Sequence, residues 1–122
     1  MTLEKKRILL VDDEFAILKV LSIKLEICGY DVFTAAGGQE ALDKVNSAKP
    51  DLMLLDVIMP GLNGLEVLRR LRAFSELPVI VYSASPENAQ GALEFGADDF
   101  IAKPLNVEDM MKRIERLLGQ KN

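Results

Sequence analysis

The sequence predicts an α/β protein in which five parallel strands form one sheet with helices on both faces, a doubly wound (βα)5 fold. Three observations lead to this class. Short apolar runs alternate five times with amphipathic stretches. The chain has 122 residues, the length of one ordinary domain. The apolar runs are nearly unbroken, as in strands covered on both faces, and right-handed crossovers then place helices on both sides of the sheet.

The first strand and helix are expected within residues 8–28. Residues 8–11 form an apolar run that ends in Asp12 and Asp13. Apolar residues then recur at helical spacing, and Gly29 supplies a helix stop. The inward positions of this helix are Ile17, Leu18, Leu21, Leu25 and Cys28. This spacing predicts that Cys28 is a buried small hydrophobic residue at the helix end.

The second and third strands are expected at residues 31–35 and 52–55, and the third ends in Asp56. A helix follows each strand, the second of them after Asn63 and Gly64. The inward positions of these helices are Ala41, Leu42, Val45 and Ala48 in one, and Leu65, Leu68 and Leu71 in the other.

The fourth strand is expected at residues 79–82, ending at Ser83. Ser85, Pro86 and Glu87 then predict a helix N-cap, a proline at the first helical position and an acid in the first turn, with the helix ending near Gly96. The fifth strand, residues 100–102, ends at Lys103. A last helix follows, with inward positions at Val107, Met110, Met111, Ile114, Leu117 and Leu118.

Composition excludes several classes of function. The net charge of −4 disfavours direct nucleic-acid binding, because a polyphosphate partner calls for a clustered basic surface. The chain has no histidine, which excludes Ser/His and Cys/His catalysis, histidine metal sites and phosphohistidine on this chain. The single cysteine cannot form an internal disulfide, which favours a reducing compartment. No apolar run has the length of a signal peptide or a membrane span, so we expect a cytoplasmic, single-domain protein.

Polar side chains follow four of the five apolar runs, where each strand ends: Asp12 and Asp13, Asp56, Ser83 and Lys103. Ligands of open parallel sheets bind at this carboxyl edge. Three carboxylates brought together there would raise at least one pKa unless a cation joined them. Oxygen ligands without histidine or thiolate favour a hard ion such as Mg²⁺, and a lysine and a hydroxyl suit a phosphoryl group.

With these residues in place, the chain resembles the receiver domains of bacterial two-component response regulators, which are similar to the chemotaxis regulator and have a flavodoxin-like three-layer fold. The resemblance spans residues 1–122 as one receiver domain. It is carried by motifs at residues 8–14, 50–56, 59–64, 83–84, 96–100 and 103–104. The chain carries no output segment after its last helix, so we expect a stand-alone or an excised receiver.

The resemblance implies a role for each site residue. Asp56 is the phosphoacceptor, with Lys103 and Ser83 as the other catalytic residues. Asp13 binds Mg²⁺ directly, Asp12 mainly through water, and the remaining protein ligands are Asp56 and the backbone carbonyl of Ile58. Ser83 and Phe100 act as switch residues, and the Lys103–Pro104 peptide is expected to be cis. The partners are a sensor histidine kinase or phosphotransfer protein, which donates the phosphoryl group, and an unidentified output protein or domain.

Two departures from the family pattern accompany this resemblance. Serine stands at position 83, where threonine is more common in the family, and it keeps the hydroxyl. The interval from Ser83 to Lys103 is slightly shorter than in most receivers, with residues 96–103 in register. The shortening therefore falls in the loop after the fourth strand or in the fourth helix, which affects the usual output surface.

Other functions remain open on the sequence. A Mg²⁺-dependent phosphohydrolase with an aspartyl-phosphate intermediate would carry an acid two residues after its nucleophile, where this chain has Ile58. A flavodoxin-like cofactor module would need a Ser/Thr/Gly-rich phosphate loop where Asp12 and Asp13 stand. A protein-binding module that works without phosphorylation would not need the acids, hydroxyl and lysine together. The leading interpretation is a phosphorylation-dependent switch that is not a turnover enzyme.

Overall fold

A computed structural model describes residues 4–119, so residues 1–3 and 120–122 of the predicted domain lie outside the described residues. Strands and helices alternate along this part of the chain. The strands are β1 (Arg7–Val11), β2 (Asp31–Ala35), β3 (Leu52–Asp56), β4 (Val79–Ser83) and β5 (Asp99–Ala102). The helices are α1 (Phe15–Ile27), α2 (Gly38–Ala48), α3 (Gly64–Arg72), α4 (Asn88–Glu94) and α5 (Val107–Leu118). The predicted (βα)5 alternation is confirmed.

The five strands form one sheet in the order β2-β1-β3-β4-β5, and every neighbouring pair is parallel. Between β1 and β3 the winding of the chain changes direction, which is the topological switch point where doubly wound folds bind ligands. The register pairs Val11 with Leu55 and Asp56 with Tyr82. The carboxyl ends of β1, β3 and β4 therefore lie side by side at this point.

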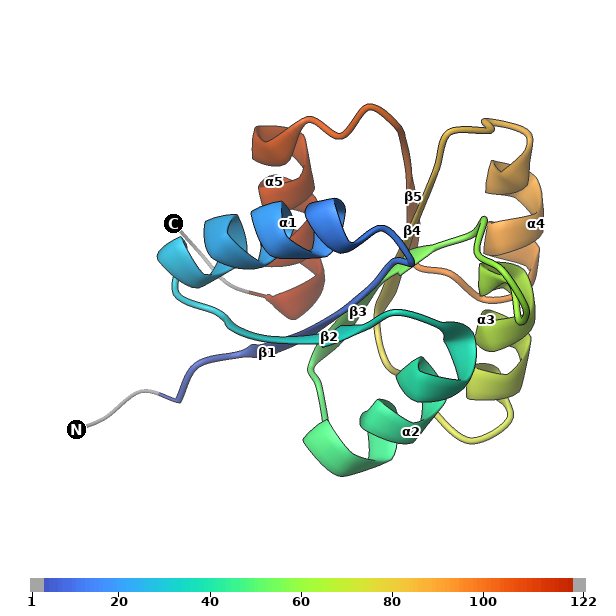
Figure 1. The fold of residues 1–122 in the computed structure, drawn as a ribbon, viewed down its shortest axis with the longest axis horizontal. Helices are drawn as coiled ribbons and strands as arrows, with labels where there is room; N and C mark the ends of the chain where they lie inside the picture. Colours follow the sequence, from blue (N-terminus) through green and yellow to red (C-terminus); the bar gives the residue numbers. More distant parts are fainter. Residues whose placement is uncertain (1–3, 120–122) are drawn as a thin grey trace.

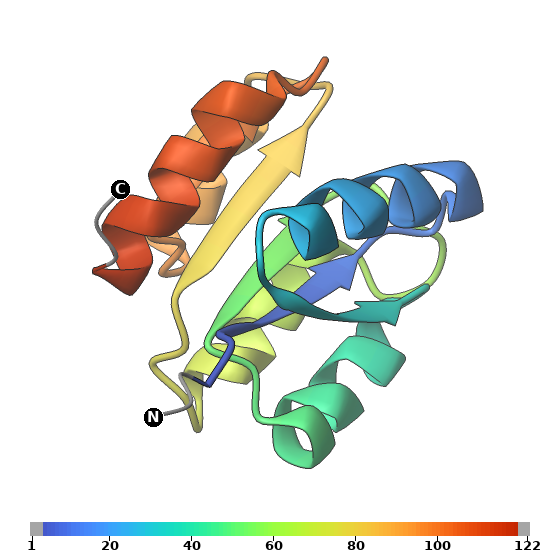
Figure 2. The ribbon, with the colours of Figure 1, turned by 90° about the vertical axis from the view of Figure 1, so that its left-hand side faces the viewer.

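Helices cover both faces of the sheet (Figure 1). The α1 and α5 helices lie on one face, and α2, α3 and α4 lie on the other, while Figure 2 shows α5 running alongside β4. Alternation along β1 sends Ile8 and Leu10 into the core with α1 and α5, and Leu9 and Val11 into the opposite core. The predicted three-layer sandwich is thus confirmed, with a separate apolar core on each side of the sheet.

The start of α4 differs from the prediction. Ser85, Pro86 and Glu87 form a tight turn in which the backbone N–H groups of Asn88 and Ala89 donate to the carbonyls of Ser85 and Pro86, both at 3.0 Å. The helix begins only at Asn88, so the predicted Ser85 cap and the proline at the first helical position are wrong. The reason is that the Ser85 N–H donates to the Ser83 hydroxyl at 3.1 Å, which holds this residue beside β4.

Cys28 also differs from the prediction, because its side chain is exposed. The α1 helix ends at Ile27, and Cys28 is its C-cap with non-helical backbone angles. The residue therefore leaves the buried stripe that Leu21 and Leu25 define. Among the residues described, no helix has the length and apolar character needed to cross a membrane.

Candidate functional site at the carboxyl edge of the sheet

The structure brings the predicted polar residues to one edge of the sheet. Asp12 and Asp13 directly follow β1, Asp56 and Ser83 are the last residues of β3 and β4, and Lys103 directly follows β5. The backbone N–H of Lys103 donates to the Ser83 carbonyl at 2.9 Å, which fixes the end of β5 to the end of β4. The Lys103–Pro104 peptide is cis, as predicted.

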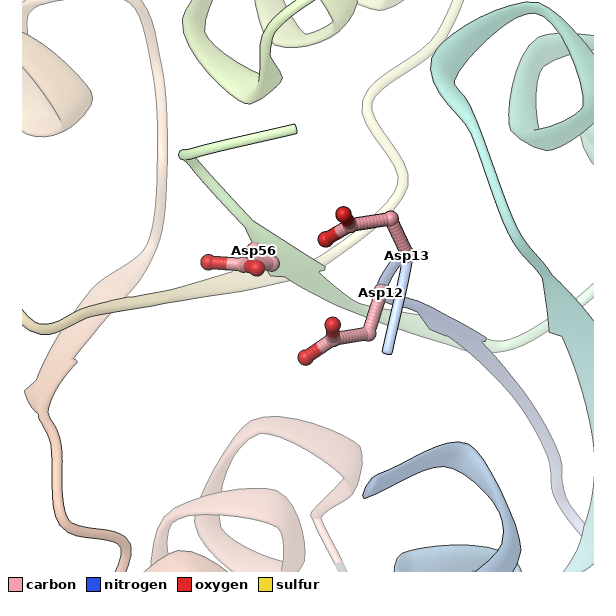
Figure 3. Close-up of side chains that lie close together, drawn as sticks. All are labelled: Asp12, Asp13 and Asp56. Atoms are coloured by element: carbon pink, nitrogen blue, oxygen red, sulfur yellow. The ribbon is translucent and has the colours of Figure 1, made fainter. Parts of the chain in front are cut away.

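Three carboxylates form the acidic part of the site. Asp12, Asp13 and Asp56 each place one oxygen within 4.8 Å of the others, and Figure 3 shows the three side chains projecting to the same side of the strand ends. Asp12 is fully buried and Asp56 is 3% exposed, whereas Asp13 faces solvent. This donor set consists of oxygen alone and carries high negative charge, so it fits a hard divalent cation such as Mg²⁺.

Lys103 lies against two of these carboxylates. Its Nζ is 3.6 Å from Asp56 Oδ2 and 3.9 Å from Asp12 Oδ2. The same Nζ lies 5.1 Å from the centre of the Tyr82 ring, within the range of a cation–π contact. The lysine therefore offsets part of the negative charge of Asp12 and Asp56.

Asp56 has a raised pKa of about 6. Burial is the largest cause, since it disfavours the charged carboxylate, and the charge of Asp12 acts in the same direction. Lys103 and the backbone N–H of Ile58 oppose the rise. The predicted increase in at least one carboxyl pKa is confirmed, and Asp56 is still mostly ionised at neutral pH.

Asp12 is oriented by two hydrogen bonds. Its Oδ1 accepts from the backbone N–H of Glu14 at 2.8 Å, and its Oδ2 lies 2.8 Å from the Tyr82 hydroxyl. Burial, and then the charge of Asp12, raises the pKa of Tyr82 well above its usual value, so the phenol keeps its proton. The strand pattern places Tyr82 in the core but gives it no role; the available signal was a hydroxyl-bearing residue directly before the strand-end serine.

Ser83 is fully buried, and its hydroxyl oxygen accepts two hydrogen bonds. One comes from the backbone N–H of Ser85 at 3.1 Å and the other from the side-chain amide of Asn88 at 3.0 Å. The hydroxyl proton is not needed for either bond. Sequence reasoning missed Asn88, because nothing in an amphipathic helix pattern marks an asparagine in its first turn as a partner of the preceding strand.

The loop after β3 is folded closely against the site. The side chain of Ile58 is 58% exposed, and the Gly64 N–H donates to the Val57 carbonyl at 2.8 Å. A Cβ at Gly64 would lie 2.3 Å from the backbone oxygen of Asp56, so the start of α3 needs glycine there. Phe100 is half-buried in β5 and packs against the core on the α2, α3 and α4 face.

Comparisons with known proteins identify the family. The family model described as the response regulator receiver domain matches residues 8–115. The alkaline phosphatase synthesis transcriptional regulatory protein PhoP of Bacillus subtilis is 42% identical over 116 residues, which cover 93% of this chain and 48% of that protein. The probable transcriptional regulator ycf27 of Cyanophora paradoxa is 42% identical over 97% of this chain and 50% of its own length. The chain thus spans about half the length of these curated relatives.

Solved structures of receiver domains share the fold of this chain. The Francisella response regulator 1452 receiver domain has a TM-score of 0.88 at 33% identity, covering 94% of this chain and 98% of that one. The response regulator TrrA from Thermotoga maritima, solved in complex with Mg²⁺-BeF, has a TM-score of 0.85 at 35% identity, covering 92% and 98%. With the family model matched from the first strand into the last helix, this chain belongs to the response regulator receiver domain family of two-component systems.

Proposed function

We propose that this receiver is a phosphorylation-dependent switch in which Asp56 accepts the phosphoryl group. The observation that supports this most directly is the Asp56 carboxylate itself, nearly buried, with Lys103 at 3.6 Å and two further carboxylates beside it. A carboxylate in this setting can act as a nucleophile while positive charge gathers around the incoming phosphate. The proposal treats residues 1–122 as one receiver domain.

Asp12, Asp13, Asp56 and the backbone carbonyl of Ile58 would hold Mg²⁺. When bound, Mg²⁺ supplies positive charge for the phosphoryl oxygens. The oxygen-only donor set and the shared space between the three carboxylates support this assignment. The complex of TrrA with Mg²⁺-BeF gives it further support, since the similarity to TrrA covers 92% of this chain.

In the transfer step, an ionised oxygen of Asp56 attacks phosphorus in line with the leaving group. With a phosphohistidine donor, the bond between phosphorus and the imidazole nitrogen breaks, and its electron pair returns to the imidazole. The Asp56 pKa of about 6 leaves the nucleophile deprotonated at neutral pH. Lys103 pairs with the transferred group, and Ser83 can donate its hydroxyl proton to a phosphoryl oxygen.

The switch would then pass from Ser83 to Phe100. Ser83 leaves its resting partners, Ser85 and Asn88, and moves toward the phosphate. Phe100 lies in the neighbouring strand, whose residue Ala102 pairs with Ser83, and turns into the space behind it. The loop after β4 and the face formed by α4, β5 and α5 change as a result, which an output partner can read.

The partners follow from chemistry and from the relatives. This chain has no histidine, so a phosphohistidine donor has to be another protein, either a sensor histidine kinase or a phosphotransfer protein. PhoP and ycf27 are named as transcriptional regulators and are about twice as long as the matched region. This similarity supports an output protein or domain as the reader of the signal, and a non-enzyme role for the receiver.

A labelling experiment tests the proposal. Wild type, Asp56→Asn and the surface control Asp43→Asn are incubated with a radiolabelled acyl phosphate, with and without Mg²⁺. We expect about one label per chain in wild type and the control, dependent on Mg²⁺, and none in Asp56→Asn. Label mapped to another residue would overturn the assignment. Many turnovers of the donor would indicate a phosphohydrolase, and no label on any residue of wild type would favour a module that works without phosphorylation.

A further inference from the structure

Tyr82 is a buried side chain whose polar end faces an acid instead of water. It is 1% exposed, and its hydroxyl lies 2.8 Å from Asp12 Oδ2 and 3.0 Å from the Val11 carbonyl oxygen. In a buried site the donor of a hydrogen bond to a carboxylate also sets the direction in which that carboxylate points. The contact therefore concerns the orientation of Asp12.

The contact crosses the sheet. Tyr82 belongs to β4, and Asp12 follows β1, while β3 lies between these two strands. Neighbouring strands are about 4.8 Å apart, so only a long side chain with a terminal donor can bridge two such intervals. Leucine or phenylalanine at this position would fill the same core but would leave the Asp12 oxygen without this donor. A tyrosine here thus joins β4, which ends in Ser83, to the segment directly after β1 that holds Asp12 and Asp13.

We propose that Tyr82 is a positioning residue of the phosphorylation site, whose hydroxyl orients the Asp12 carboxylate for cation binding. The inference rests on the Mg²⁺ site proposed above. Asp12 is fully buried, so protein donors take the place of solvent in setting its orientation. Glu14 holds one carboxylate oxygen and Tyr82 holds the other, each at 2.8 Å. These two contacts fix the carboxylate and use two of its roughly four lone-pair sites. Lys103 Nζ lies 3.9 Å from Oδ2, and the other sites can accept a cation or its water.

Known metal sites indicate how much Mg²⁺ affinity the loss of the Tyr82 hydroxyl should cost. Loss of a hydrogen bond to a ligating side chain costs about 10–100-fold in metal affinity. Tyr82→Phe removes only the hydroxyl, and it keeps the ring that fills the core and lies beneath Lys103. We therefore expect Mg²⁺ to bind Tyr82→Phe on the order of tenfold more weakly than wild type. The cation–π contact of Lys103 is retained.

The composition offers a matched control and a spectroscopic probe. The chain has two tyrosines and no tryptophan, so tyrosine emission comes from Tyr30 and Tyr82 alone. Tyr30 is buried in the core with α1 and α5 and directly precedes β2. The amino ends of the parallel strands lie at the edge of the sheet opposite the site, so Tyr30 is far from it. Tyr30→Phe therefore makes the same chemical change away from the site and leaves Tyr82 as the one emitter.

The experiment is a calorimetric Mg²⁺ titration of wild type, Tyr82→Phe, Tyr30→Phe, Asp12→Asn and the double variant Asp12→Asn/Tyr82→Phe, followed also by tyrosine emission. We expect weaker binding in Tyr82→Phe, wild-type affinity in Tyr30→Phe with a Mg²⁺-dependent change of Tyr82 emission, and no additional loss from Tyr82→Phe once Asp12 is asparagine.

Equal affinity in wild type and Tyr82→Phe would overturn the role of Tyr82 and leave the proposed function standing. The role of Tyr82 is also overturned if Tyr82→Phe weakens binding as much in the Asp12→Asn background as in wild type, because its effect would then not act through Asp12. If wild type itself binds no Mg²⁺, the metal site and this inference both fail.

Discussion

The side-chain amide nitrogen of Asn88 lies 3.0 Å from the hydroxyl oxygen of Ser83, which ties the first turn of α4 to the last residue of β4. Together with the N–H of Ser85 at 3.1 Å, this bond holds the serine in its resting position. Under the proposed switch, inward movement of Ser83 must break or rearrange both bonds. Under that proposal, Asn88 opposes activation in the unphosphorylated state.

Asn88→Ala should shift the switch toward its active form. Losing one hydrogen bond of about 1 kcal/mol corresponds to about a fivefold larger active population before phosphorylation. Amide chemical shifts of residues 84–87 and of Phe100 should move partway toward those of the protein saturated with Mg²⁺ and beryllium fluoride. Gln90→Ala, an exposed change in the same helix, serves as the control. Spectra of Asn88→Ala that remain at the wild-type positions would contradict the prediction.

Ser83→Ala should separate phosphorylation from signalling. The variant keeps Asp56 and Lys103, so it should still bind Mg²⁺ and accept label, but it lacks the hydroxyl that follows the phosphate. With Mg²⁺ and beryllium fluoride, we expect the neighbours of Asp56 to shift and Phe100 to stay at its resting position. A Phe100 shift as large as that of wild type would show that the signal takes another route.

Mg²⁺ should raise the melting temperature of the protein, because a ligand that binds only the native state stabilises it by mass action. At 100 times its dissociation constant the gain is about 2.7 kcal/mol. The increase should shrink in Asp13→Ala and in Asp56→Asn, each of which removes a carboxylate from the shared space. Asp43→Asn should respond as wild type does. Scanning calorimetry with and without Mg²⁺ measures these shifts, and equal responses in all four proteins would place the ion elsewhere.

Metal-free stability should depend on pH through Asp56. Its pKa is raised from 3.8 to about 6, so the folded state binds the proton more tightly than the unfolded chain does. The stabilisation from this proton is complete below about pH 4 and is lost as pH rises through about 6. Its size is on the order of 3 kcal/mol. Asp56→Asn should remove this component from urea unfolding measured between pH 4 and 7.5.

The same titration should affect metal binding in the opposite sense. Protonated Asp56 is a poor ligand and no nucleophile, so Mg²⁺ affinity and the labelling rate should fall as pH drops below about 6. For the stability prediction, the pH profile of urea unfolding of metal-free Asp56→Asn is compared with that of wild type between pH 4 and 7.5. Parallel profiles would assign the pH dependence of stability to other groups.

Gly64→Ala should destabilise the fold and distort the site. The added Cβ would lie 2.3 Å from the Asp56 backbone oxygen and 2.7 Å from Val57 Cα, and backbone atoms cannot move aside cheaply. We expect a loss of about 2–4 kcal/mol and slower labelling. Gly91→Ala is the matched control, since its new Cβ meets only Leu65 Cδ1 at 3.5 Å and alanine favours a helix by about 1 kcal/mol. Equal unfolding midpoints for the two variants would contradict the close approach at Gly64.

The acids, the serine and the lysine of the site could be predicted from sequence, because the carboxyl ends of parallel strands meet at one edge whatever the details of packing. Asp12 and Asp56 follow apolar runs directly, so their positions depend only on where the strands end. The contact between Tyr82 and Asp12 depends instead on strand order and on which face of β4 the ring takes. Neither property is contained in a local pattern, and hence Tyr82 is predicted as core alone.

Errors in the prediction fell at helix ends. Ser85 and Pro86 have the residue types of a helix start, but a hydrogen bond from the Ser85 N–H to the Ser83 hydroxyl, two residues earlier, holds Ser85 in the loop. Cys28 has the spacing of a buried residue, yet the helix ends one residue earlier. In both places the residue types fit more than one local conformation, and the sequence pattern does not fix at which residue the helix begins or ends.

The sheet order also has a consequence for folding. The site combines Asp12 and Asp13, which follow β1, with Lys103, which follows β5 at the far end of the described fold. Contacts this far apart in sequence form late, after the intervening loops have closed. In the proposed reaction, a partly unfolded receiver therefore has Asp56 without the positive charge of Lys103 beside it. If Asp56 is the phosphoacceptor, we therefore expect efficient phosphorylation to require the completed fold.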